Sequence, residues 1–494
     1  MARQSARLLY DLARTQTGIH GDNPVCRGGR FSADTLVSYN NDLCYANCVP
    51  FHPQLKQTMP WIAERADEIS WERLQILMER TVAEARRRIC ERPRRVLLLP
   101  PDITRMHSGA GRITEILYEL LAAEAEIHVI PTLGQHVPHT PEENRQMFGS
   151  IPNERIHAHD WRGGSVPVGE IPGRFVDDAT QGAANWPIPI VLNQMLMEEP
   201  WDLIINVGHV VPHEVLGFAN HNKNYFIGLA GKDLICAAHM AAASCGIENN
   251  LGCLVTPVRA SFNRAEDEYL EHLPDLYVQV VLARNDRDQL VHTGVYVGDD
   301  RETYLAAARQ SREENITIFD EPVEKIVCVM QGDEFFSTWV ANKAIYRTRM
   351  ALADGGELIV IAPGLKRFGE QPEVDEFIRK YGYVGTPTVM EQYRQKADMQ
   401  DLAHAAAHLM HGSSEGRFII TYAPGHMTQS EIEGVNFRYA DINEALRRYR
   451  PEQSKQGWNT TSDGERYFFI PTPSAGLWAT RAKLFNRPTG FDGP

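Results

Sequence analysis

Apolar residues in the first half of the chain follow two different patterns. Residues 68–90 and 111–125 repeat their apolar positions every three or four residues, which is typical of amphipathic helices. Residues 94–101, 126–133 and 200–210 are short continuous apolar runs, as expected of strands that are buried on both faces. Strand, helix and strand in this order predict a βαβ unit and therefore a parallel sheet.

A second series of the same kind begins near residue 320. Strands are predicted at residues 324–332, 356–364, 418–425 and 466–473, and helices at residues 337–356, 373–382 and 442–450. We therefore predict an α/β protein with two α/β domains, residues 61–305 and 306–494, each with a parallel-sheet core. In residues 1–60, Gly, Pro, Asn and Cys interrupt every periodic pattern, so we expect an irregular N-terminal extension there.

The composition limits the classes of function. Of the 494 residues, 43% are hydrophobic and 23% are charged, as in a soluble globular protein. The net charge of −14 argues against nucleic acid or an anionic membrane as the main partner, so a small molecule is expected. No apolar segment has the length of a transmembrane helix or of a secretory signal. The eight cysteines are dispersed without a CxxC pair, which favours a reduced, cytoplasmic setting.

Ionisable residues gather in the loops that follow the predicted strands. Ligand sites of open α/β sheets lie at the carboxyl ends of the strands. Three such loops contain the sequences PPDITR (100–105), GQHVPHTPEE (134–143) and GHVVPHEVLGFANHNK (208–223). In the second domain, Lys343 follows a predicted strand in the same way. We therefore predict an active site in the cleft between the two domains.

Each of these residues also has a purely structural explanation. Thr140 and Glu143 have the spacing of a helix capping box, and Asp102 has the position of a helix N-cap. Lys223 suits a surface turn, and His239 lies in an apolar helix where a core histidine is ordinary. If each explanation were correct, several unrelated residues would lie at the same edge of one sheet by chance. A shared chemical role is the simpler explanation for the group.

Three kinds of chemistry fit the residue types. Histidines at positions 136, 213, 221 and 239 suit a metal site that activates a water molecule. Two histidines on opposite sides of a substrate suit acid–base catalysis, with Arg105 holding a carboxylate. Lys223 suits covalent attachment of a carbonyl compound or a cofactor. The residue types alone leave these three alternatives open.

The order and spacing of these residues resemble the nickel-dependent lactate racemase family. Members of that family have two α/β domains and hold a nickel-pincer nucleotide between them. His213 precedes Lys223 by ten residues and His239 follows it by sixteen, as in the family. The remaining matches are Asp102, Thr104 and Arg105 in a DxTR motif, Gly134, His136, Thr140 and Glu143 in the next loop, and Lys343 before Gly355 and Gly356. The resemblance covers about residues 90–480.

The resemblance implies a cofactor site in this chain. Lys223 would carry the pyridinium-derived nickel-pincer nucleotide through its side chain, and His239 would bind the nickel. Thr104 and Gly228 would be further cofactor contacts.

The resemblance also implies a substrate site and a reaction. His136 and His213 would be the acid–base pair, while Arg105 and Lys343 would hold the carboxylate of a 2-hydroxy acid. Two further positions, Asp102 and Trp339, would orient Arg105 and contact the substrate, respectively. The implied reaction is racemisation or epimerisation by hydride transfer to the cofactor through a 2-keto acid.

The chain departs from the family pattern in three places, one of which is Ile227 before Gly228, where the family has a proline. Ala219, Asn220 and His221 stand where the family has a serine and two glycines before the lysine. Trp339 and Val340 stand where the family has a tyrosine and a glutamine. We therefore predict a 2-hydroxy acid other than lactate, one that is bulkier. The alternatives are a non-catalytic protein that binds an acidic metabolite or a nucleotide, and a zinc or iron hydrolase.

Overall fold

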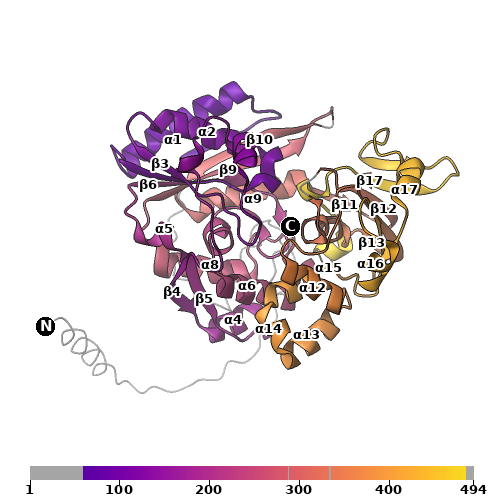
Figure 1. Cartoon of the computed structure of the whole chain (residues 1–494). Coiled ribbons are helices and arrows are strands. Elements are labelled where there is room, and N and C mark those ends of the chain that lie inside the picture. The colour runs from indigo at the N-terminus through magenta and orange to yellow at the C-terminus, as the bar shows by residue number, and fades with distance from the viewer. Residues whose placement is uncertain (1–58, 288, 333–334, 486–494) are drawn as a thin grey trace, which may run out of the picture. The chain divides into compact units, whose positions relative to one another are not determined.

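Two six-stranded sheets form the cores of the chain (Figure 1). The computed structural model describes residues 59–485, except residues 288, 333 and 334. The predicted N-terminal extension, with Cys26, Cys44 and Cys48, therefore lies almost entirely outside the described residues. The predicted α/β class with parallel-sheet cores is confirmed, although each sheet also has an antiparallel edge.

The first sheet contains the strands that the apolar runs predicted. Its strands, in spatial order, are β1 (Ile62–Arg65), β10 (Leu290–Gly298), β9 (Asp275–Arg284), β6 (Leu203–His209), β2 (Arg95–Leu99) and β3 (Glu126–Val129). The last four strands of this order are parallel, whereas β1 and β10 form an antiparallel edge. Val96 to Leu99 are fully buried, because helices cover both faces of the sheet.

Helices on the two faces separate alternate residues of each strand. Helices α1 (Trp71–Arg88) and α2 (Ala110–Leu121) pack on the face that contains Val96 and Leu98. Helices α6 (Lys232–Ser244) and α8 (Pro257–Ala265) pack on the face that contains Leu97 and Leu99. This alternation follows from the period of two residues in a strand.

The change from the first sheet to the second comes after helix α9 (Arg301–Asn315). The boundary predicted at residue 305 falls inside α9, which packs against β9 and β10 of the first sheet. The next strand, β11 (Ile316–Phe319), pairs instead with β18 (Leu477–Thr480) near the end of the chain.

Short elements fill the connections of the first half. They are α3 (Pro141–Phe148), β4 (Ser165–Ile171), α4 (Gly173–Thr180), β5 (Ile188–Asn193), α5 (Gln194–Glu198), β7 (Pro212–His213), β8 (Gly217–Phe218) and α7 (Ile247–Asn250). The capping box predicted at the start of α3 is confirmed. The Thr140 side chain accepts a hydrogen bond from the Glu143 backbone N–H, and the Glu143 side chain accepts one from the Thr140 backbone N–H.

The second sheet is parallel except for one edge strand. Its strands, in spatial order, are β15 (Arg438–Tyr439), β14 (Ile419–Pro424), β13 (Leu352–Ala362), β12 (Val323–Val329), β17 (Arg466–Ile470) and β16 (Gly457–Thr460). Strand β16 alone among them runs antiparallel to its neighbour. Its helices are α12 (Pro372–Tyr381), α13 (Thr386–Gln395), α14 (Ala397–Asp401), α15 (Ala403–Gly412), α16 (Gln429–Gly434), α17 (Ile442–Tyr449) and α18 (Arg481–Phe485).

One predicted helix of the second half is wrong in its extent. Instead of a single helix over residues 337–356, the chain forms α10 (Thr338–Ala341) and α11 (Lys343–Thr348) and then enters β13. Leu352 pairs with Val323 of β12. Pairing with a neighbouring strand therefore overrides the helical pattern of this segment.

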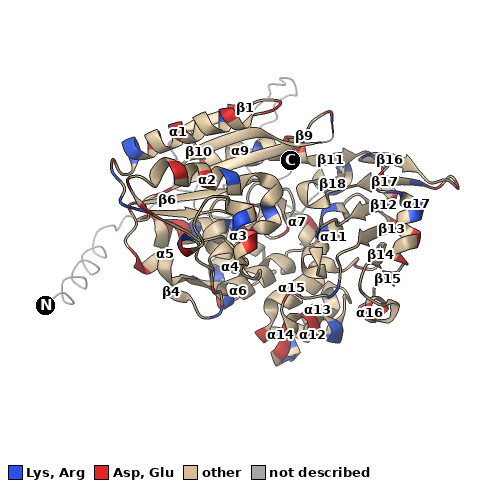
Figure 2. Cartoon of the chain, turned by 45° about the horizontal axis from the view of Figure 1, so that its top comes forward, with Lys and Arg blue, Asp and Glu red and all other residues tan. Residues whose placement is uncertain are grey.

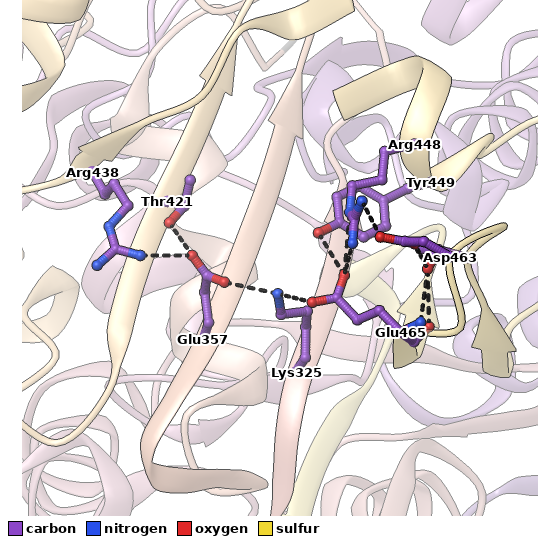
Figure 3. A network of polar contacts seen from close by, with 9 residues as sticks. Lys325, Glu357, Thr421, Arg438, Arg448, Tyr449, Asp463 and Glu465 are labelled. Atoms are coloured by element: carbon purple, nitrogen blue, oxygen red, sulfur yellow. Dashed lines mark hydrogen bonds and ion pairs between the residues drawn. The ribbon is translucent and has the colours of Figure 1, made fainter. Parts of the chain in front are cut away.

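The amino ends of the strands in the second sheet carry a network of paired charges (Figure 3). Lys325 of β12 lies 3.0 Å from a carboxylate oxygen of Glu357 on β13, and it also contacts Glu465 just before β17. Arg448 of α17 lies 3.0 Å from Glu465 and 2.9 Å from Asp463. We call these five residues the amino-end network.

Charged residues of both signs are interspersed on the outer helices, such as α1 and α12 to α14, whereas the strands of the first sheet are mostly uncharged (Figure 2). None of the helices between residues 59 and 485 has both the length and the apolar character that crossing a membrane requires.

Candidate active site

One cavity brings together the ten residues to which the resemblance assigned roles. It lies at the carboxyl ends of β2, β3 and β6, and α6, α10, α11 and α15 complete its wall. The predicted site residues that line it are Asp102, Thr104, Arg105, His136, His213, Lys223, Gly228, His239, Trp339 and Lys343. Their position is thus a finding, whereas their roles in a reaction remain predictions.

Asp102 and His136 form a hydrogen-bonded pair in this cavity. Asp102 caps the short 3-10 helix Ile103–Ser108, where its Oδ1 accepts hydrogen bonds from the Thr104 backbone N–H at 3.1 Å and from Thr104 Oγ1 at 2.6 Å. The other carboxylate oxygen of Asp102 is bonded to Nδ1 of His136. We predicted that Asp102 orients Arg105, but its hydrogen bonds go to Thr104 and His136 instead. Thr104, predicted to contact a cofactor, thus helps to hold Asp102.

The pairing fixes both the orientation and the charge of His136. Because Nδ1 faces Asp102, Nε2 is the ring nitrogen left for a ligand. Burial by itself would lower the pKa of His136, but the carboxylates of Asp102 and Glu370 raise it above the ordinary value. Burial likewise opposes ionisation of Asp102, but His136 and Thr104 hold the pKa of this carboxyl well below its usual range. The pair therefore resembles the base and orienting carboxylate of many acid–base enzymes.

His213 sits in the β7–β8 hairpin and has the opposite electrostatic character. Its Nδ1 accepts a hydrogen bond from the Val215 backbone N–H at 3.2 Å, so the proton of the neutral ring is on Nε2. This Nε2 lies 3.9 Å from Oε1 of Glu214. Burial lowers the pKa of His213 well below the ordinary value, although Glu214 opposes this effect. The cavity thus contains one histidine that favours the charged form and one that favours the neutral form.

Three cations in the cavity have no carboxylate within ion-pairing distance among the residues that the structure describes. Besides Lys223, which is described below, these are Arg105 and Lys343, the first residue of α11. Burial and the nearby Arg105 lower the pKa of Lys343 to about 8. A bound carboxylate would supply the missing negative charge.

Lys223 follows a loop whose backbone has a conformation typical of glycine. Asn220 and His221 have φ angles of 68° and 59°, at the positions where the resemblance led us to expect glycines. The buried side chain of Arg259 stabilises this loop. Its guanidinium donates hydrogen bonds to the carbonyl oxygens of Phe218 at 2.6 Å and Asn220 at 3.3 Å. The loop therefore keeps the left-handed backbone without the glycines.

The Lys223 amine has no hydrogen bond to a described residue. Burial and the charge of Arg105 lower its pKa to about 8. A larger fraction of this amine is therefore unprotonated near neutral pH than for an exposed lysine, as nucleophilic attack requires.

His239 and Gly228 border the cavity next to Lys223. His239 Nδ1 donates to the carbonyl oxygen of Ile235 at 2.8 Å, which leaves the lone pair of Nε2 for a metal ion or another ligand. A Cβ atom on Gly228 would lie 2.4 Å from Cβ of Thr132, so only glycine fits there.

His221 does not belong to the cavity. Its ring stacks on Tyr277 with a centroid distance of 4.1 Å and lies 5.3 Å from the ring of Tyr304. Within the described ranges, no three His, Cys, Asp or Glu side chains form a group that could hold a metal ion. The structure thus gives no support to a metal site built from four protein histidines.

Five further polar residues of the cavity were not assigned a role from the sequence. Glu214 and Tyr346 line the cavity, together with three histidines of α15, His404, His408 and His411. The histidine spacing of four and then three residues places them on one face of a helix, and this was the available signal. Helix α15 packs on α6, where Sγ of Cys236 lies 3.3 Å from Nδ1 of His404.

Comparison with known proteins relates the first half of the chain to one family. Residues 70–250 match the family model of the lactate racemase N-terminal domain. A protein of Thermotoga maritima has a similar structure, with a TM-score of 0.72, 24% sequence identity and coverage of 84% of this chain and 100% of that chain. No curated protein sequence matches the chain.

A second solved structure, the lactate racemase apoprotein of Thermoanaerobacterium thermosaccharolyticum, has a TM-score of 0.60 and 14% identity, and the match covers 84% of this chain and 94% of that chain. The two structural likenesses show a common fold. The domain match confirms, for residues 70–250, the resemblance that the spacing of the site residues indicated.

Proposed function

We propose that this chain, which carries a lactate racemase N-terminal domain in residues 70–250, is a racemase or epimerase of 2-hydroxy acids. We further propose that it works with a nickel-pincer nucleotide attached to Lys223. The observation that carries the proposal is the single cavity in which two histidines of opposite character lie beside two cations without a carboxylate partner. The same cavity contains a lysine amine and a histidine with a free lone pair.

The residues around Lys223 fit the proposed cofactor. The amine has no hydrogen-bond partner among the described residues, and its pKa of about 8 gives it a larger fraction of the unprotonated form, which amide formation needs, than an exposed lysine has. Nε2 of His239 is a suitable nitrogen ligand for nickel. Asn220 and His221 preserve the backbone that allows a close approach to the loop. When bound, the group supplies the capacity to accept a hydride from carbon 2 of the substrate and to return it.

The cations of the cavity suit the carboxylate of a 2-hydroxy acid. Arg105 offers a planar pair of N–H donors, and Lys343 offers a compact charge. Neither forms an ion pair with a described residue, so binding a carboxylate breaks no existing contact. Fixing the carboxylate also fixes carbon 2 and its hydroxyl group relative to the two histidines.

The two histidines suit the two directions of proton transfer. His136, held through Nδ1 by Asp102, takes the hydroxyl proton on Nε2 and becomes an imidazolium ion that the Asp102 carboxylate stabilises. For the opposite enantiomer, His213 must take the hydroxyl proton and return it as an imidazolium ion, because its neutral ring with the proton on Nε2 can donate only a hydrogen bond to the substrate oxygen. Two such groups are needed, because the two configurations at carbon 2 direct their hydroxyl groups to opposite sides.

The proposal is tested by following the configuration at carbon 2. Protein from a host that makes the cofactor is incubated separately with lactate, 2-hydroxyhexanoate, 2-hydroxyadipate and D-gluconate, and the products are separated by chiral chromatography. We expect the configuration at carbon 2 of at least one acid to be inverted. The His136→Asn and His213→Asn variants should lose this activity. Protein that carries nickel but leaves all four acids unchanged would refute the proposal.

A further inference from the structure

We infer that the substrate is a polyhydroxylated 2-hydroxy acid whose side-chain hydroxyl groups bind to the polar atoms left without partners among Glu214, Tyr346, His404, His408 and His411. This set, called the polar wall below, lines the same cavity as the residues assigned to the carboxylate and to carbon 2. The inference rests on the proposed function, because it concerns the part of the substrate beyond carbon 2.

Four of the five residues of the polar wall belong to the second half of the chain, and three of them lie on α15. His404, His408 and His411 are only 1%, 5% and 4% exposed, although histidine is usually more accessible. The indole of Trp339 stacks on His408 with a centroid distance of 4.5 Å and meets His404 edge-on at 5.7 Å. The aromatic contacts therefore hold the imidazole rings in fixed orientations along the cavity.

The hydrogen bonds of the polar wall are only partly satisfied. Both ring nitrogens of His408 have partners, the hydroxyl groups of Tyr346 at 2.8 Å and Tyr383 at 2.9 Å. In contrast, Nε2 of His404 and Nε2 of His411 are buried and have no hydrogen bond to any described residue. Buried polar atoms of this kind normally have partners, so a ligand with polar groups is the expected partner here.

Glu214 adds a third polar atom without a hydrogen bond. Its Oε2 is buried, and its nearest cation, a guanidinium nitrogen of Arg347, lies 3.7 Å away. Burial opposes ionisation of Glu214, but the guanidinium of Arg347 holds the pKa of its carboxyl well below the usual range. Glu214 is therefore an ionised acceptor that faces the same cavity as the histidines.

The charges of the cavity disfavour a second carboxylate on the substrate. Arg347 is fully buried, is paired with Glu214 and does not line the cavity. Burial lowers the pKa of His411 to about 3, so this imidazole is neutral. A terminal carboxylate would thus face the negative Glu214 without a cation of its own.

A hydroxyl group on the substrate can form hydrogen bonds with the unpartnered atoms of the polar wall, whereas an alkyl group or a carboxylate cannot pair with all of them. It both donates and accepts, so it can pair with a neutral imidazole in either tautomer and can donate to Glu214. An alkyl chain would leave Nε2 of His404 and Nε2 of His411 without partners. A site with such unpaired buried polar atoms binds a ligand that lacks the matching polar groups much more weakly. The polar wall therefore favours hydroxyl groups over both an alkyl chain and a carboxylate.

Binding of three six-carbon acids tests the inference without relying on turnover. Isothermal titration calorimetry of the holoprotein is carried out with D-gluconate, 2-hydroxyhexanoate and 2-hydroxyadipate. These acids have carbon chains of equal length and differ in carrying hydroxyl groups, an alkyl chain or a second carboxylate beyond carbon 2. We expect D-gluconate to bind tightest, by about tenfold or more. Equal or tighter binding of either other acid overturns the inference.

Variants of α15 identify the residues responsible. His404→Phe and His411→Phe keep a ring but remove the nitrogen atoms, so the ratio of the D-gluconate to 2-hydroxyhexanoate affinities should fall toward one. His272→Phe, at an exposed histidine outside the cavity, should leave the ratio unchanged. If the α15 variants weaken both acids equally, the polar wall serves the fold or the cofactor and the inference is wrong.

Measuring the rate of inversion at carbon 2 alongside binding distinguishes a failure of this inference from a failure of the proposed function. Tight D-gluconate binding that depends on His411, without inversion of any acid, supports the polar wall and refutes the racemase proposal. Inversion that is fastest with 2-hydroxyhexanoate supports the racemase proposal and refutes the polar wall.

Discussion

Lys325 and Lys343 both belong to the second half of the chain, but they occupy opposite ends of the strands and have opposite surroundings. In the amino-end network, Lys325 lies between Glu357 and Glu465 (Figure 3). Burial alone would lower its pKa, but the two carboxylates raise it. In the cavity, burial and Arg105 lower the pKa of Lys343 to about 8, and the carboxylates of Glu214 and Asp102, neither within ion-pairing distance, offset only part of this shift.

The comparison distinguishes charges that stabilise the fold from charges that are kept for a ligand. Each member of the amino-end network has an opposite charge within contact distance. The cavity instead keeps Arg105, Lys223 and Lys343 without such partners among the described residues, which costs stability. Perturbed pKa values of this kind gather at functional sites, and here they coincide with the cavity.

The largest expected effect is at Lys223. Lys223→Arg removes the amine that an amide requires while it keeps the positive charge. We expect inversion at carbon 2 to fall by roughly 10⁴-fold or more, because the cofactor can no longer be attached. Lys232→Arg is the matched control, since Lys232 is paired with Asp401 outside the cavity. Inversion by Lys223→Arg at the normal rate would contradict the account.

Lys343→Met tests whether an unpaired cation serves the substrate. We expect kcat/KM to fall by about 10²- to 10³-fold, because the carboxylate loses a charged hydrogen bond in a buried site. The midpoint of urea unfolding should stay the same or rise, because a buried charge without a partner has been removed. A clear loss of stability would mean that Lys343 belongs to the fold rather than to the site.

Asp102→Asn tests how His136 is tuned. Asp102 raises the pKa of His136, so its removal leaves burial to lower that pKa. The limb of the pH–rate profile that reports unprotonated His136 should therefore move to lower pH, and the maximal rate should fall by about 10- to 10²-fold. The profile is measured from initial rates of inversion. An unmoved limb would show that His136 is not the titrating base.

The smallest expected effect is at Lys325. Lys325→Met leaves Glu357 and Glu465 facing each other at partly buried positions, so the free energy of unfolding should fall by about 1–2 kcal/mol. Urea unfolding measures this change, and the rate of inversion should remain that of the unchanged protein. Reduced activity without reduced stability would break the comparison with Lys343.

The strands were the part of the fold that could be predicted from the sequence. Val96 to Leu99 form a continuous apolar run because helices bury both faces of β2, and this pattern is local. The extension of β13 back to Leu352 could not be predicted. The segment before it has a helical pattern, and only pairing with Val323 makes it a strand.

The cavity residues from the first half of the chain could be predicted from the sequence more readily than those from the second half. Asp102, His136 and His213 follow strands whose carboxyl ends meet at one edge, so their proximity follows from topology. His404 and His411 lie in an alanine-rich helix that has the composition of a core element. Their contact with the site arises only when α15 packs on α6, which no local pattern records.

The most direct test of the central claim is the state of the Lys223 side chain. Protein from a host that makes the cofactor is digested, and the peptide that contains Lys223 is examined by mass spectrometry alongside nickel analysis of the intact protein. We predict a pyridinium-derived adduct on Lys223 and stoichiometric nickel that is lost in His239→Ala. An unmodified Lys223 in protein without nickel would contradict the account.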